Sequence, residues 1–170
     1  RAIIVYNTAS TAVQPALINN NFVVNTGGTG NCTGLNVYGA AYSHWYYNNV
    51  LISNSVVANG SALFVNAGFT GSPVEIGNNN LINKGGTLVY DVGANYTDLD
   101  TVDYNNGYTT GTTFGNWNAS PVTTFATWKT ASGKDANAIN VDPGYITNTN
   151  LHVTNMAING KARVYYKVKD

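Results

Sequence analysis

Charged residues are scarce in this chain of 170 residues. They make up 9% of the sequence, against about 25% in an ordinary soluble domain. Eight basic and eight acidic residues give a formal net charge of zero, while hydrophobic residues reach 44%. This composition excludes disorder driven by charge, and it provides no basic field that would attract nucleic acid phosphates. We expect no nucleic acid partner.

Cysteine, histidine and glutamate are almost absent, which removes several kinds of site. Cys32 stands alone, so the sequence allows no intramolecular disulfide and no zinc site built from thiolates. His44 and His152 are the two histidines, and Glu75 is the single glutamate. No Gly-x-Ser-x-Gly motif accompanies them. No apolar stretch approaches the roughly 18 residues of a membrane-spanning helix, so we expect no membrane span.

What the sequence has in abundance is asparagine, arranged in imperfect repeats. Each repeat has an apolar start, an Asn-rich corner and a further apolar segment. The reference asparagines, each two positions before an apolar or aromatic residue, are Asn20, Asn54, Asn79 and Asn106. They are separated by 34, 25 and 27 residues, a spacing that suits the coils of a β-solenoid with insertions in its loops.

Asparagine at a corner has a physical reason. Its side chain tolerates left-handed backbone and forms hydrogen bonds with the nearby main chain. In stacked coils, each Asn can also bond to the Asn of the next coil, so that a ladder satisfies its own polar groups in the core. We therefore expect the reference asparagines to be structural.

The segments between the corners have strand length and contain β-branched and aromatic residues, as in 35–38, 62–65 and 87–90. Only residues 125–132 suggest a short helix. The sequence predicts an all-β fold: a single-stranded, right-handed parallel β-helix of about five or six coils with loop insertions. An antiparallel sandwich is the alternative, since Asn-Gly occurs three times.

The Asn-Asn-Asn-Phe, Ser-Asn-Ser-Val and Asn-Asn-Asn-Leu lines resemble the parallel β-helix repeats of pectate-lyase-like proteins. Residues 102–106, 125–139, 141–145 and 151–153 resemble the closing coils of β-helix domains in large secreted and surface proteins of Bacteroidetes. The resemblance implies an extracellular or cell-surface location, and it implies no particular activity, because this fold hosts lyases, hydrolases, adhesins and spacers. After Ala162 the sequence departs from the pattern.

We expect residues 1–170 to form one β-helix domain, a segment of a larger protein. Half of the basic residues lie in the last ten positions. Charged residues at the open face of a last coil oppose end-to-end association of strand edges. The segment 161–170 is therefore interpreted as a polar C-terminal cap or tail.

The acidic residues form one local cluster, Asp98, Asp100 and Asp103. It is a candidate calcium site, although the spacing does not match an EF-hand loop and solvated turn residues are the simpler interpretation. No other cofactor is expected. General acid–base catalysis needs two positioned titratable groups, and the cluster has no evident partner.

An aromatic segment is the candidate glycan contact: Tyr42, His44, Trp45, Tyr46 and Tyr47. Aromatic rings can stack on sugar faces while polar neighbours bind hydroxyl groups. On a strand, alternate residues face opposite sides, so part of this segment must point inward, and ordinary packing is the competing interpretation.

Three functions remain open at this point. The first is a non-catalytic extracellular module, a spacer or an adhesin that contacts a polysaccharide, a cell-surface glycan or another surface. The second is a polysaccharide lyase or hydrolase, or a fragment of one. The third, an ice-binding solenoid, would need a regular row of threonines, and Thr109–Thr113 is a local group only.

Overall fold

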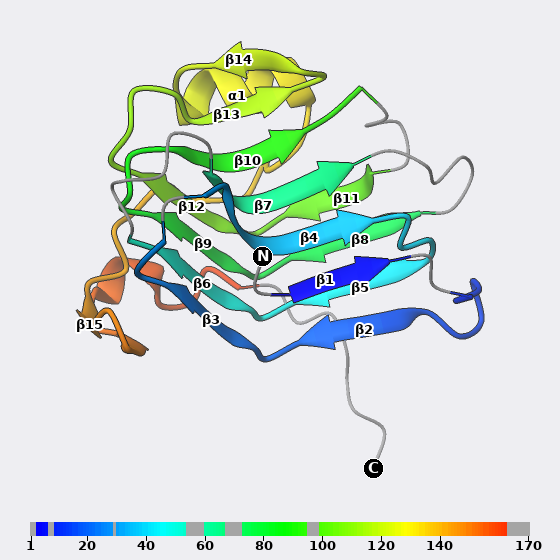
Figure 1. The fold of residues 1–170 in the computed structure, drawn as a ribbon, viewed down its shortest axis with the longest axis horizontal. Helices are drawn as coiled ribbons and strands as arrows, with labels where there is room; N and C mark the ends of the chain where they lie inside the picture. Colours follow the sequence, from blue (N-terminus) through cyan, green and yellow to red (C-terminus); the bar gives the residue numbers. More distant parts are fainter. Residues whose placement is uncertain are drawn as a thin grey trace.

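The fold is a stack of coils, each contributing one short strand to each of three sheets (Figure 1). The computed structural model describes residues 3–6, 9–28, 30–53, 60–66, 73–94 and 99–162. Within these ranges, no helix is long and apolar enough to cross a membrane.

The first sheet contains β1 (Ile3–Tyr6), β4 (Cys32–Tyr38), β7 (Gly60–Asn66), β10 (Leu88–Val92), β13 (Gly115–Trp117) and β14 (Ser120–Val122). The second contains β2 (Ala16–Asn19), β5 (Ser43–Tyr46), β8 (Val74–Gly77) and β11 (Leu99–Asp103). The third contains β3 (Phe22–Asn25), β6 (Asn49–Ile52), β9 (Asn80–Asn83) and β12 (Asn106–Thr109).

All pairings within these three sheets are parallel except that of β13 with β14. The β-solenoid is therefore confirmed, and the antiparallel sandwich is excluded. The predicted number of coils was wrong, because the stack has about three turns rather than five or six. The reason is that the chain leaves the coil path after β13, which still pairs in parallel with β10, and then forms the antiparallel strand β14, a helix and a returning C-terminal segment.

The core forms from inward side chains that stack in register from coil to coil. One row in the second sheet contains Ile18, Trp45, Ile76 and Val102, all buried. Burying each large apolar side chain contributes about 1.5–3 kcal/mol. The rows therefore hold the coils together despite the small number of charges. Cys32 is a buried member of the same core.

An asparagine ladder connects the second sheet to the third. Its members are Asn21, Asn48, Asn79 and Asn105, and it ends at Asp135. Each Nδ2 donates to the side-chain oxygen of the next coil, over 2.8, 2.9, 3.0 and 3.1 Å in turn. From the second member on, each asparagine Nδ2 also donates to a backbone oxygen of the coil before it. The buried amides of this ladder are thus satisfied internally.

The predicted structural asparagines coincide with this ladder only at Asn79. Asn20 is exposed and occupies the left-handed corner, with φ of 57°. Asn54 lies outside the described residues. Asn106 is buried in an outer row, where its Nδ2 donates to Asn80 Oδ1 over 3.2 Å and to the oxygen of Val141 over 2.9 Å.

A short helix closes the stack beyond the last coil. Helix α1 (Phe125–Ser132) matches the predicted helical segment. It begins after Thr124, whose hydroxyl accepts from a first-turn N–H, and it ends at Gly133 in the left-handed conformation. Trp128 is buried and stacks on the ring of Tyr90, with centroids 4.4 Å apart. The helix therefore covers the core at this end.

The C-terminal segment returns along the outer face of the third sheet. It contains β15 (Tyr145–Thr147), β16 (Asn150–Val153) and a 3₁₀ helix at Met156–Ile158. Leu151 is buried against the outward side chains of Leu51 and Ile82. Of the predicted polar tail 161–170, only residues 161 and 162 lie within the described part of the chain.

Candidate functional site

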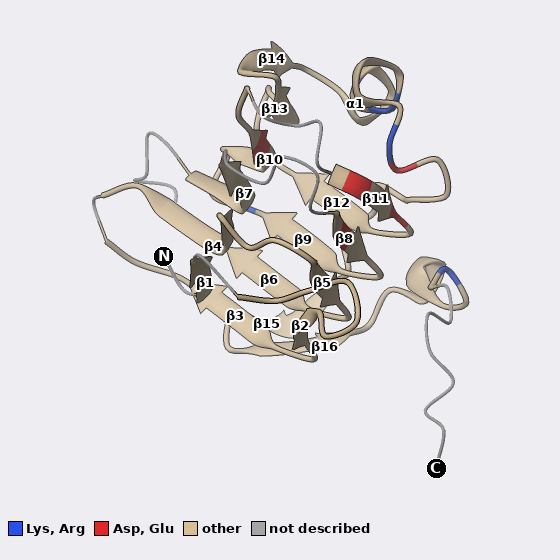
Figure 2. Cartoon of the chain, turned by 90° about the vertical axis from the view of Figure 1, so that its right-hand side faces the viewer, with Lys and Arg blue, Asp and Glu red and all other residues tan. Residues whose placement is uncertain are grey.

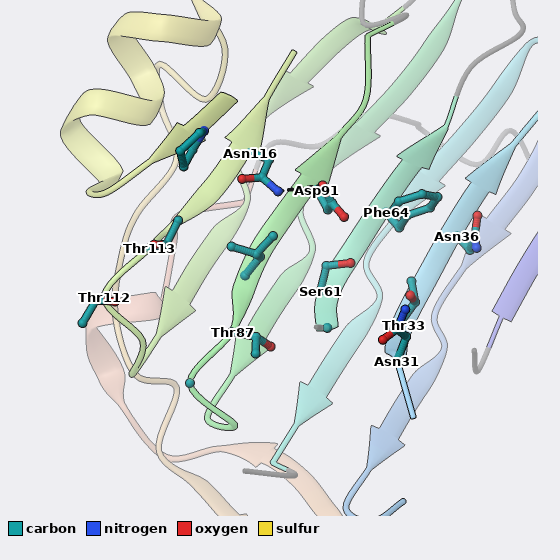
Figure 3. Close-up of a pocket in the computed structure, with 14 residues that line it drawn as sticks. Asn31, Thr33, Asn36, Ser61, Phe64, Thr87, Asp91, Thr112, Thr113 and Asn116 are labelled. Atoms are coloured by element: carbon teal, nitrogen blue, oxygen red, sulfur yellow. Dashed lines mark hydrogen bonds between the residues drawn. The ribbon is translucent and has the colours of Figure 1, made fainter. Parts of the chain in front are cut away.

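A groove of about 460 Å³ lies on the outer face of the first sheet, across β4, β7, β10 and β13 (Figure 3). The third sheet is partly covered on its outer face by the C-terminal segment, where Leu151 packs against Leu51 and Ile82. The first sheet instead presents its outward side chains to this groove. Figure 2 shows how few charged residues the coils carry.

The floor of the groove is a row of side chains in register: Asn36 of β4, Phe64 of β7, Asp91 of β10 and Asn116 of β13. These residues point outward because their neighbours in each strand point into the core. Figure 3 shows them side by side on successive strands. The partly buried phenyl ring of Phe64 thus lies between Asn36 and Asp91 in this row. The amide of Asn116 lies beyond Asp91.

Hydroxyl and amide groups surround this row. Those in the groove are Asn31, Thr33, Ser61, Thr87, Thr112 and Thr113. Each offers a hydrogen-bond donor and an acceptor without a formal charge. The lining is therefore suited to a ligand with many hydroxyl groups and little charge.

Asp91 is the one carboxylate among the described residues that line the groove. Asn116 Nδ2 donates to Asp91 Oδ1 over 3.0 Å, which orients the carboxylate along the row. Glycoside hydrolysis ordinarily uses a pair of carboxyl groups on either side of the scissile bond. The groove as described offers a hydrogen-bond acceptor rather than such a pair.

Asn36 is the unusual member of the row. Its side chain is 0% exposed, and neither Nδ2 nor Oδ1 has a hydrogen-bond partner among the described residues. The large majority of buried side-chain polar atoms in proteins have such a partner. Asn36 is therefore a buried amide in the lining of the groove whose donor and acceptor have no partner among the described residues.

The aromatic segment predicted to contact a glycan lies on the second sheet, away from the groove. His44 and Tyr46 point outward, where the Tyr46 hydroxyl donates to the Glu75 carboxylate and His44 Nε2 lies 4.0 Å from Glu75 Oε1. Tyr46 is nevertheless buried. This face therefore forms a small polar cluster rather than an open aromatic platform.

Trp45 points into the core, as strand alternation requires. It is fully buried, and its indole N–H donates to Ser43 Oγ over 2.9 Å. Trp45 is not available to stack on a sugar. Tyr42 and Tyr47 occupy left-handed corners, with φ of 46° and 57°, and are partly exposed. A glycan contact by these two residues stays a prediction.

The predicted calcium cluster is placed in part. Asp98 lies outside the described residues, and Asp100 is exposed. Asp103 already accepts hydrogen bonds from the backbone and side chain of Asn137, over 2.7 and 2.8 Å. Within the described ranges, no three His, Cys, Asp or Glu side chains are arranged to hold a metal ion.

The groove itself was not predicted from the sequence. The available signal was a polar or aromatic residue that interrupts an apolar strand, as Asn36 does between Leu35 and Val37, and Phe64 between Leu63 and Val65. Recognising that these residues share a row requires the register between coils, which only the structure provides.

Comparison of the chain with protein-family models, with curated proteins and with solved structures finds no match in any of the three. The chain is assigned to no family on that basis, and its function is inferred from the site alone.

Proposed function

We propose that this chain is a non-catalytic, extracellular adhesion module that binds neutral glycans in the groove of the first sheet. The observation that carries this proposal is the lining: uncharged amides and hydroxyls arranged around the ring of Phe64, over about 460 Å³. This volume lies within the usual range of ligand sites, about 300–1,000 Å³.

The chemistry of the lining favours a carbohydrate over other ligands. Sugar hydroxyls both donate and accept hydrogen bonds, and the Asn, Ser and Thr side chains of the groove do the same. The apolar face of a sugar ring can pack against Phe64. With a formal net charge of zero, the chain offers no field that would favour a polyanion.

The lining of the groove favours glycan binding over glycan cleavage. Asp91 is the sole carboxylate among the described lining residues, and acid–base cleavage needs a second group. The alternative is a lyase or hydrolase whose other groups lie in further coils. The same proposal includes two further points. The chain is part of a secreted or surface protein like those of Bacteroidetes, and its repeats are related to those of pectate-lyase-like proteins.

Calorimetric titration with neutral oligosaccharides tests this function. Phe64→Ala should weaken binding at least about ten-fold, equivalent to about 1.4 kcal/mol. The control is Phe22→Ala, which removes a ring that is 62% exposed on the third sheet, outside the groove. Binding that Phe22→Ala weakens and Phe64→Ala leaves unchanged would place the glycan elsewhere. Release of cleaved product by wild type, abolished in Asp91→Asn, would favour the enzyme.

A further inference from the structure

Asp91 gives the groove a negative charge that no described lining residue balances. The described residues that line the groove include this carboxylate and no Lys or Arg side chain. Two of the described lysines are bound elsewhere: Lys84 pairs with Asp142 over 2.9 Å, and Lys134 donates to two backbone oxygens of β11. The charge that a ligand meets in the groove is therefore that of Asp91.

One oxygen of this carboxylate is held by the protein, and the other is left for a ligand. Asn116 Nδ2 donates to Asp91 Oδ1 over 3.0 Å, the contact drawn as a dashed line in Figure 3. Among the described residues, Asn116 is the one hydrogen-bond partner of the Asp91 side chain. Asp91 is partly exposed and lies beside Phe64 on the floor of the groove. A ligand there meets an oriented carboxylate that can accept a further hydrogen bond.

The charge of a ligand decides how well it matches this carboxylate. A sugar on the floor of the groove displaces water from Asp91, and a charge that loses water is unfavourable unless it gains an opposite charge or hydrogen bonds. A protonated amine provides both, because its N–H groups form charge-assisted hydrogen bonds with a carboxylate. A hydroxyl provides only the hydrogen bond, and a uronic acid brings a second negative charge close to the first. Affinity should therefore fall in the order amino sugar, neutral sugar, uronic acid.

We propose that Asp91 selects glycans by charge, so that the groove binds chains of hexosamine with free amino groups most tightly and discriminates against chains of uronic acid. Neutral glycans bind with intermediate affinity. This inference rests on the proposed function, because it names the class of sugar that the same groove prefers. An unfavourable charge placed against a competing ligand is a general source of specificity. Asp91 is thus a specificity-determining residue.

The test compares trimers of glucosamine, glucose and glucuronic acid by calorimetric titration of the whole chain, at a pH where the amine is protonated and the uronic acid is ionised. Wild type should bind the glucosamine trimer at least about ten-fold more tightly than the glucuronic acid trimer, a difference of about 1.4 kcal/mol. Asp91→Asn keeps the size of the side chain and an oxygen that can accept from Asn116, but it removes the charge. It should bring the three affinities within about three-fold of one another.

Asp100→Asn is the matched control. It makes the same change of charge at an exposed residue of β11 in the second sheet, outside the groove. This variant should keep both the order of the three trimers and the ten-fold ratio. An equal loss of the ratio in Asp100→Asn and Asp91→Asn would mean that selection arises from the charge of the whole chain, which would overturn the role of Asp91.

Salt gives a second readout that requires no variant. Dissolved ions screen interactions between charges, over a distance that shortens from about 10 Å at 0.1 M to about 3 Å at 1 M. The ratio between the glucosamine and glucuronic acid trimers should therefore fall as sodium chloride is added, while the affinity for the glucose trimer stays constant. A ratio that salt leaves unchanged would overturn selection by charge.

The remaining outcomes separate the inference from the function on which it rests. Equal binding of the three trimers by wild type, or tightest binding of the glucuronic acid trimer, would overturn the inference and leave glycan binding intact. A preference that survives Asp91→Asn would overturn the role of this residue. Absence of binding by all three trimers would overturn the inference, and absence of binding by other neutral oligosaccharides as well would overturn the function.

Discussion

Replacing Asp135 by asparagine tests how the ladder ends. Every amide in the ladder donates to the oxygen of the next coil, so the last member must accept and has no further coil to which it could donate. Asp135 meets this need with two acceptors: Oδ1 accepts from Asn105 Nδ2 over 3.1 Å, and Oδ2 accepts from Trp128 Nε1 over 2.9 Å. Asparagine would set an amide N–H against one of these donors.

The structure fixes the size of the expected effect. A buried donor left unpaired costs about 1–3 kcal/mol. Asp135→Asn leaves one donor unpaired, so it should lower the free energy of unfolding by about 1–3 kcal/mol. Asp135→Ala leaves both unpaired and should cost about 2–6 kcal/mol. For a chain of this length, 1 kcal/mol corresponds to about 2–4 °C in Tm.

Urea denaturation followed by circular dichroism measures these differences, with Asp100→Asn, an exposed carboxylate, as the matched control. Trp128→Phe removes the competing N–H, so the cost of Asp135→Asn should shrink in that background by about 1–2 kcal/mol. Equal midpoints for wild type and Asp135→Asn, or strictly additive effects of the two substitutions, would refute the reasoning.

Three further outcomes are expected. Asn79→Ala leaves two donors of the preceding ladder member unpaired and should lower the free energy of unfolding by at least about 2 kcal/mol, whereas Asn148→Ala, on an exposed turn, should leave the urea midpoint unchanged. Burial raises the pKa of Asp135, so the folded chain holds this proton more tightly than the unfolded chain. The free energy of unfolding of wild type should therefore fall, relative to Asp135→Asn, as pH rises from the ordinary value of 3.8 through the raised pKa, and a urea series across this range checks the sign. Gly34→Ala would place a methyl 2.3 Å from a core side-chain atom and should lower Tm by an amount equivalent to about 1–3 kcal/mol, while Gly30→Ala, with open space around it, should not.

The parallel solenoid could be predicted because its cause is repeated along the sequence. Asn-rich corners and short β-branched strands recur at intervals of one coil, and the coils stack as expected. The number of turns could not be predicted in the same way. Residues 113–162 retain strand-like and polar composition, yet they form the closing helix, its hairpin and the segment that covers the third sheet.

The positions of the ladder asparagines were only partly predictable. In runs such as Asn19–Asn21, composition does not tell which side chain points inward, and the predicted Asn20 lies one residue before the ladder member Asn21. In the second coil the left-handed corner is occupied by Tyr47, with φ of 57°, so the corner has no Asn before the ladder member Asn48, and the repeat pattern predicts Asn54 instead. The discriminating feature is an inward apolar residue three positions before each ladder asparagine, as Trp45 stands before Asn48.

The same spacing explains why the groove could not be found from the sequence. The number of residues between the inward row of the second sheet and the ladder is the same in every coil, as between Trp45 and Asn48. No loop intervenes there, and the corner has one conformation. From the groove row to the ladder the intervals are 12, 15 and 14 residues, for the pairs Asn36–Asn48, Phe64–Asn79 and Asp91–Asn105. The loops between the first and second sheets absorb this variation. Repeats aligned on their asparagines therefore place the second and third sheets correctly and lose the register of the first, the sheet on which Asn36 and Phe64 meet.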